Sequence, residues 1–138
     1  MGLDMFLYKA ENEKALEDFY QLDYEQWQVE RPKFMAGQWR KANAIHAWFV
    51  DNCQNGVDEC QLTQVSGIQL QKLIGICEQV LEDNSKAASL LPPRSGFFFG
   101  SYKIDEWYIR DIEYTIEACT AGLEAIQEGK KVYYQSSW

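Results

Sequence analysis

His46 is the only histidine in the chain and the first residue to consider for chemistry. Trp39 and Asn43 precede it at steps of four and three, and apolar spacing over residues 38–53 predicts a helix. On such a helix the three side chains would share one face and present an indole, an amide and an imidazole to one ligand. Arg40 adds a positive charge nearby. We therefore predict a binding site for a small polar ligand on this segment.

A catalytic role for His46 needs a nucleophile within hydrogen-bond reach. Cys53 lies two turns further along the predicted helix, about 10 Å away at 1.5 Å per residue, so this pair cannot act directly. Ser136 and Ser137 could approach from the C-terminal segment, but the sequence does not place them. The favoured interpretation makes His46 a partly buried structural residue bonded to backbone or to a carboxylate. A small hydrolase or transferase that uses His46 is the alternative.

The C-terminal residues combine polar side chains with a large aromatic ring. Gln135 and Trp138 end a segment whose alternation predicts a strand, although terminal residues usually fray. Docking of Trp138 into the domain would explain the ending structurally, and a pocket lined by Gln135 and Ser137 would explain it functionally. The candidate ligand-binding residues are therefore Trp39, Arg40, Asn43, His46, Gln135 and Trp138.

No metal site, cofactor or catalytic residue is predicted. The four cysteines lack the paired spacing of zinc sites, and we expect free thiols, with Cys77 and Cys119 in the core. Five carboxylates of the last predicted helix could form an acid pair, but a solvated helix face is the favoured interpretation. These carboxylates are Asp105, Glu106, Asp111, Glu113 and Glu117.

Charge is distributed unevenly along this acidic chain, whose net charge is -8. Residues 1–30 hold eight acidic and two basic side chains, whereas residues 31–50 hold four basic and no acidic ones. The acidic balance disfavours general nucleic-acid binding through phosphates. It leaves two other interpretations open, namely a partner-binding surface and a mimic of DNA. The candidate partner-binding residues are Glu17, Asp18, Asp23 and Glu25.

The periodicities that position these residues predict a compact α+β domain spanning residues 1–138. A small sheet should include the N- and C-terminal strands and be packed by about three main helices. Residues 11–34 permit a helix that Pro32 stops, and this is the least determined segment. The predicted elements are strands at residues 3–8, 60–65 and 132–138, and helices at 38–53, 66–81 and from about 105 to 128.

Two further features concern location and packing. We find no apolar run long enough to span a membrane and no basic leader, so we expect a reducing cytoplasm and no membrane partner. The aromatic run at residues 96–100 is interpreted as a packing segment.

Four short blocks of the sequence carry a resemblance. They are MGLDM at residues 1–5, WRKANAIHAWF at 39–49, GFFFG at 96–100 and YYQSSW at 133–138. Together they resemble a family of small proteins encoded by bacteriophages and prophages, a family without an assigned activity. The resemblance implies a phage accessory protein in the bacterial host cytoplasm. Its target would be a host protein or a small polar, nucleotide-like ligand, and it could act by inhibiting a host defence.

Overall fold

The computed structural model describes residues 2–94 and 103–138 of the chain. The aromatic run at residues 96–100 lies outside this part. The elements, in chain order, are β1 (Asp4–Ala10), α1 (Glu13–Tyr20), α2 (Tyr24–Phe34), β2 (Met35–Arg40), α3 (Asn43–Cys53), β3 (Thr63–Val65), α4 (Gly67–Glu82), a 3-10 turn (Asn84–Lys86), α5 (Ala87–Leu90), α6 (Glu106–Gln127) and β4 (Lys131–Ser137).

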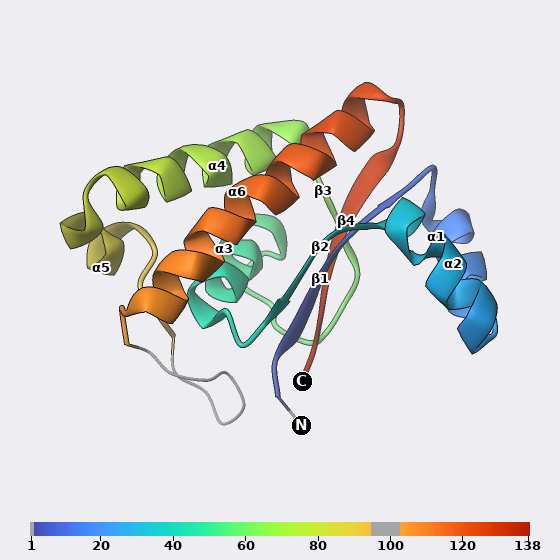
Figure 1. Cartoon of the computed structure of the whole chain (residues 1–138), viewed down its shortest axis with the longest axis horizontal. Helices are drawn as coiled ribbons and strands as arrows, with labels where there is room; N and C mark the ends of the chain where they lie inside the picture. The colour runs from blue at the N-terminus through green and yellow to red at the C-terminus, as the bar shows by residue number, and fades with distance from the viewer. Residues whose placement is uncertain (1, 95–102) are drawn as a thin grey trace.

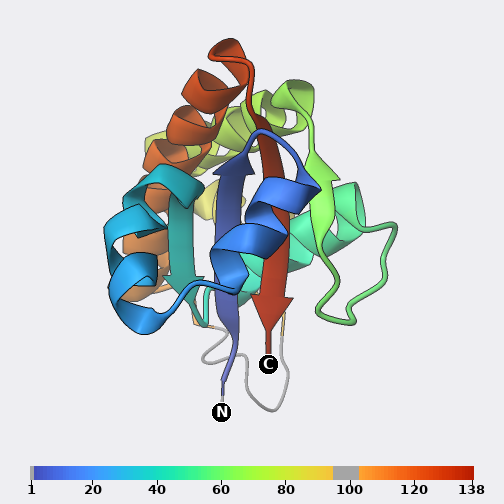
Figure 2. The same ribbon diagram turned by 90° about the vertical axis from the view of Figure 1, so that its right-hand side faces the viewer.

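The strands form one antiparallel sheet in the order β2-β1-β4-β3. Its central pair joins the two ends of the sequence, since Asp4 lies opposite Ser137 and Ala10 opposite Lys131. Figure 2 shows β1 and β4 side by side, with β2 and β3 outside them. The predicted α+β fold with N- and C-terminal strands in one sheet is confirmed.

The two faces of the sheet are covered by different helices (Figure 1). Helices α3, α4 and α6 cover one face, and α1 and α2 lie on the other. Side chains alternate along β1 accordingly: Met5 and Leu7 join the larger core, whereas Tyr8 joins the smaller one with Phe19 of α1. The three helices over the larger core correspond to the three main helices predicted from apolar spacing.

The helix predicted over residues 38–53 is wrong at its start. Residues up to Arg40 belong to β2, which pairs with β1, and α3 begins only at Asn43. The backbone of Lys41 has φ +59° and turns the chain between the two elements. Because Trp39 is on a strand and His46 on a helix, the shared helical face does not exist. Pairing with β1 has overridden a spacing that also fits a helix.

Residues 11–34 form two short helices instead of one. Asn12 and Asp23 cap them, each accepting a hydrogen bond from a backbone N–H of the first turn. Helix α2 ends at Phe34, two residues after Pro32. The first-turn caps of the two large helices are those expected, with a Ser66–Gln69 capping box on α4 and Asp105 at the start of α6.

The four cysteines are free thiols, as expected. Cys77 and Cys119 are fully buried in the larger core, and burial raises the pKa of Cys77 to about 12. Within residues 2–94 and 103–138, every helix is too short or too polar to cross a membrane.

Candidate functional site

A cavity of about 250 Å³ lies where α3 and α6 begin, and we call it the α3–α6 cavity. The turn from β2 into α3 forms one wall, and the first turns of α6 form the other. The side chains that matter for its chemistry are Arg40, Lys41, Asn43, Lys103, Asp105, Trp107 and Asp111. Two of these, Arg40 and Asn43, are candidates from the sequence.

The α3 end of the cavity is electropositive. Ala42 occupies the capping position of α3, and its methyl side chain cannot cap the helix by a hydrogen bond. The first-turn N–H groups of a helix have no partners within the helix, and the helix dipole places partial positive charge there. Arg40 and Lys41 add exposed basic side chains on one side, and Lys103 adds a third on the other. This end of the cavity favours an anion.

Trp107 supplies a flat apolar surface at the cavity. It is 64% exposed although it is the second residue of a long helix. The guanidinium carbon of Arg110 lies 4.9 Å from the centre of its ring on the helix surface. An exposed indole beside an electropositive pocket can stack on an aromatic ring of a ligand.

Asp111 is the unusual titratable group of the cavity. Burial, together with the negative charge of Asp105, raises its pKa to about 6. Asp105 itself caps α6 by accepting hydrogen bonds from the backbone of Trp107 and Tyr108. These two carboxylates therefore do not belong to the solvated helix face favoured from sequence, and Asp111 changes charge near neutral pH.

Asn43 is buried in the cavity wall and has a structural contact. Its Oδ1 accepts a hydrogen bond from the backbone N–H of Arg94 at 3.0 Å. The Arg94 side chain in turn forms an ion pair with Asp51 of α3, at 2.6 Å between Nη2 and Oδ2. Asn43 thereby fastens the segment after α5 to the start of α3.

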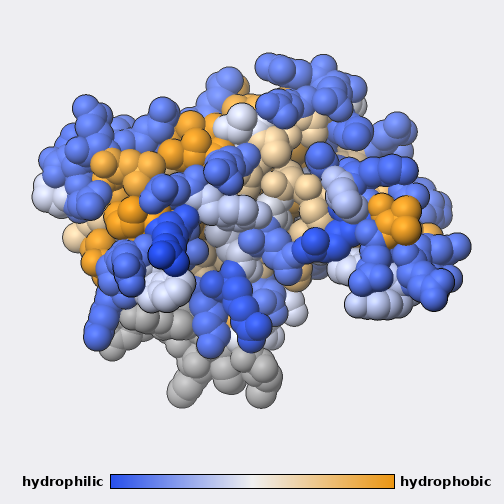
Figure 3. Space-filling model, viewed as in Figure 1, coloured by the Kyte–Doolittle hydropathy of each residue, from blue (hydrophilic) through white to orange (hydrophobic). Residues whose placement is uncertain are grey.

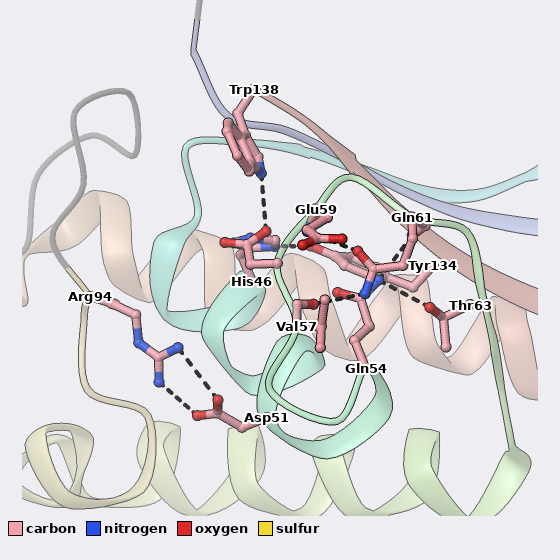
Figure 4. A network of polar contacts seen from close by, with 11 residues as sticks. His46, Asp51, Gln54, Val57, Glu59, Gln61, Thr63, Arg94, Tyr134 and Trp138 are labelled. Carbon is pink, nitrogen blue, oxygen red and sulfur yellow. Dashed lines mark hydrogen bonds and ion pairs between the residues drawn. The ribbon is translucent and has the colours of Figure 1, made fainter.

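His46 is not among the described residues that line this cavity; it lies in a separate buried network (Figure 4). The imidazole is 1% exposed. Its Nδ1 lies 2.7 Å from the Tyr134 hydroxyl, and its Nε2 lies 3.0 Å from Oδ1 of Asp58. Trp138 Nε1 donates to the same Asp58 oxygen at 3.0 Å. The network therefore links α3, the loop before β3 and the end of β4.

The hydrogen bonds of this network have one consistent direction. Burial lowers the pKa of His46, although Asp58 opposes the effect, so the ring is neutral at pH 7. Burial also raises the pKa of Tyr134 well above its ordinary value. The carboxylate can only accept, so Nε2–H donates to Asp58 and Tyr134 donates to Nδ1. This is the structural, carboxylate-bonded histidine that the sequence analysis favoured.

The remaining ligand-binding candidates lie apart. Trp39 is 3% exposed, and its Nε1 donates to Thr115 Oγ1 at 2.9 Å inside the core. Gln135 lies on the opposite face of the sheet, where its Oε1 accepts from the Tyr20 hydroxyl at 3.1 Å. Trp138 docks on Asp58. The structure thus distributes the six residues over four places and brings only Arg40 and Asn43 to the α3–α6 cavity.

Sequence reasoning missed most residues of the cavity and of the network. Lys41 directly follows Arg40, which was a candidate, so its position in the sequence could have indicated it. Trp107 is a bulky aromatic residue that falls outside the apolar stripe of its helix, which is a signal for an exposed ring. No sequence signal indicates Asp58 or Lys103, because loops bring them to their places.

The four candidate partner-binding residues are exposed on α1, on α2 or at the cap between them. Asp18 forms an ion pair with Lys14 at 2.6 Å, and Asp23 is the α2 cap. Seen as in Figure 1, the surface over α1 and α2 is largely hydrophilic, with a small hydrophobic patch (Figure 3). Two of the four acidic residues therefore have local structural partners.

The described part of the chain contains no group of three or more histidine, cysteine or carboxylate side chains arranged to hold a metal ion. The chain was also compared with known proteins: no protein-family model, no curated protein and no solved structure matches it.

Proposed function

We propose that this protein is a binding protein whose α3–α6 cavity takes a small anionic ligand of the nucleotide class. One observation carries the proposal. A single cavity combines the start of α3, where the capping residue Ala42 makes no side-chain hydrogen bond, with three basic side chains and the exposed Trp107. Backbone N–H groups at a helix start bind phosphate well, and an indole stacks on a nucleobase.

The size of the cavity limits the ligand. Small-molecule sites usually enclose about 300–1,000 Å³, and this cavity, at about 250 Å³, lies just below that range. A mononucleotide with its base partly outside, over Trp107, fits better than a dinucleotide. The phosphate would lie at the α3 end, near Arg40 and Lys41, and the ribose would lie between the two helices.

The resemblance to phage and prophage proteins supports a role as an accessory protein in the cytoplasm of the bacterial host. In that role the protein would sequester its ligand or present the occupied cavity to a host protein. The alternative of an enzyme that uses His46 finds no support in the geometry, because both ring nitrogens are engaged in a buried network. The alternative of a DNA mimic rests on the exposed acidic residues of α1 and α2 alone.

Titration of the protein with AMP, inorganic phosphate and adenosine tests the proposal. We expect AMP to shift the backbone amide NMR signals of Ala44 and Ile45, and to bind more tightly than phosphate or adenosine alone. Lys41→Gln should weaken AMP binding on the order of tenfold, since a charge-assisted contact contributes about 1.5–3 kcal/mol. Lys72→Gln, an exposed change on α4, is the control and should have no effect.

Asp111 gives the proposal a second, independent measurement. Its ionised carboxylate repels an anion in the cavity, so sulfate, which stays a dianion over this range, should bind more tightly at pH 5.5 than at pH 7.5, across the pKa of about 6. Asp111→Asn should tighten binding at pH 7.5 and flatten this dependence. Unchanged Ala44 and Ile45 signals at millimolar AMP, with a folded protein, would refute the proposed site.

A further inference from the structure

A second cavity, of about 210 Å³, lies on the opposite face of the sheet, between the sheet and helices α1 and α2. We call it the aromatic cavity, because five of its lining residues are Phe6, Tyr8, Phe19, Tyr20 and Trp27. Among the residues that the structure describes, it has no lining residue in common with the α3–α6 cavity. The function proposed above does not use this cavity.

The aromatic rings that line this cavity pack against one another. Phe19 and Tyr8 are almost fully buried, and Phe19 stacks on Trp27 with ring centres 5.9 Å apart. Phe6 and Tyr8 stack on the sheet at 5.7 Å. Tyr20 is 45% exposed and is held by Gln135, so it lies on the solvent side. A flat ring that enters here would meet aromatic faces and edges, which is the arrangement that aromatic pairs prefer.

Arg31 is the only charged side chain among the described residues that line the aromatic cavity. Its guanidinium donates to the side-chain oxygen of Gln38 and lies 5.5 Å from the ring centre of Trp27. In the described part of the chain, no carboxylate lies within 4.0 Å of this half-buried guanidinium. A guanidinium with only neutral partners keeps its positive charge available for a planar anion.

The other polar groups of the cavity carry no negative charge that would repel such an anion. Burial raises the pKa values of Tyr8 and Tyr20, so both hydroxyls stay neutral at pH 7. The Gln38 side chain is neutral as well. The site therefore has a net positive charge of one from Arg31, surrounded by neutral aromatic walls.

From these contacts we infer that the aromatic cavity binds a small carboxylic acid with one aromatic ring. The ring would stack among the aromatic side chains, and the carboxylate would meet the Arg31 guanidinium. The volume agrees, since an apolar cavity of about 150 Å³ holds benzene and this one, at about 210 Å³, leaves room for a carboxylate. A two-ring or phosphorylated ligand would exceed it.

The probes for the test are phenylacetate, its neutral analogue 2-phenylethanol, and cyclohexylacetate, which has the charge without the aromatic ring. The indole N–H signal of Trp27 in an NMR titration reports on the site, and Trp27→Phe assigns it. We expect saturable binding of phenylacetate, with both other probes at least about tenfold weaker. This comparison uses the unaltered protein and does not depend on the folding of a variant.

Arg31→Gln should weaken phenylacetate binding about 10- to 100-fold and leave 2-phenylethanol binding unchanged, because only the charge-assisted contact is lost. Arg31→Lys, which keeps the charge but not the planar fork, should fall between. Lys33→Gln on the same helix is the matched control and should change neither, because Lys33 is exposed and pairs with Glu30.

Equal affinity for phenylacetate and 2-phenylethanol would overturn the inference, and so would phenylacetate shifts confined to Ala44 and Ile45. Binding at the aromatic cavity should persist in the Lys41→Gln variant. Its loss in Arg31→Gln, together with intact AMP binding, would separate the two sites.

Discussion

Burial can shift the pKa of a side chain in this protein more than a neighbouring charge does. His46 illustrates this, because desolvation lowers its pKa while Asp58, only 3.0 Å away, acts in the opposite direction. The folded state therefore takes up a proton on His46 less readily than the unfolded chain does. This group contributes stability at neutral pH that is lost as the pH falls below about 6.5 through the folded pKa.

The single histidine makes this measurable by one imidazole NMR signal. In the unaltered protein, we expect it to titrate below pH 6.5, and in Asp58→Asn lower still, because the charge that raises the pKa is removed. Glu59→Gln, an exposed neighbour, should leave the curve unchanged. A His46 midpoint at or above 6.5 would show that burial does not dominate the pKa of this side chain.

The contact between Trp138 and Asp58 can be tested as a pair. Trp138→Phe keeps an aromatic ring but removes the N–H donor, and it should cost about 0.5–1.5 kcal/mol of unfolding free energy. Urea denaturation of this variant, of Asp58→Ala and of the double variant completes a double-mutant cycle. The two losses should be less than additive, since each change removes the same hydrogen bond. Strict additivity would mean that the indole N–H does not bond to Asp58.

At the level of the elements, substitutions at helix caps should cost stability, whereas substitutions on exposed helix surfaces should not. Asp23 caps α2, with its carboxylate 2.9 Å from the N–H of Gln26. Asp23→Ala should cost about 1 kcal/mol, and Asp23→Asn, which can still accept the bond, only a few tenths by urea denaturation. Glu17→Lys on exposed α1 should lie within about 0.5 kcal/mol of the unaltered protein. An equal loss of unfolding free energy in Asp23→Asn and Asp23→Ala would exclude the capping role. A test of the acidic surface as a binding site should therefore change Glu17 and Glu25 and keep Asp23.

Elements with strong local signals were predictable, and those defined by long-range contacts were not. The 3–4 spacing of α6 and the Ser66 capping box are local, and both appear where the sequence places them. The spacing around Trp39 fits a helix, and only the pairing with β1 makes this segment a strand. The candidate site followed the same pattern. Arg40 and Asn43 were found by charge and polarity, whereas Asp111 reaches the cavity through α6, whose position against α3 no local pattern encodes, and Lys103 reaches it from the segment before α6.

At the scale of the whole molecule, the close approach of α6 to the sheet depends in part on Gly37 of β2. A methyl group at Gly37 of β2 would overlap the Cβ of Ala118 on α6. Gly37→Ala should therefore cost about 1–3 kcal/mol, because backbone or helix must move. Gly75 lies in α4 with nothing within 4 Å of such a methyl, so Gly75→Ala should instead stabilise by about 0.5–1 kcal/mol. Thermal melting of both variants measures this, and a neutral Gly37→Ala would show that α6 shifts without cost.

The pairing of β1 with β4 also has a consequence for the order of events on the ribosome. While the chain is being made, β1 can pair only with β2, so the strand edge that β4 later covers stays open. The larger core cannot close either, because Val132 and Tyr134 of β4 belong to it. Folding of this sheet must therefore wait until synthesis has passed β4, and a nascent chain stalled before residue 131 would present an open strand edge to chaperones and proteases.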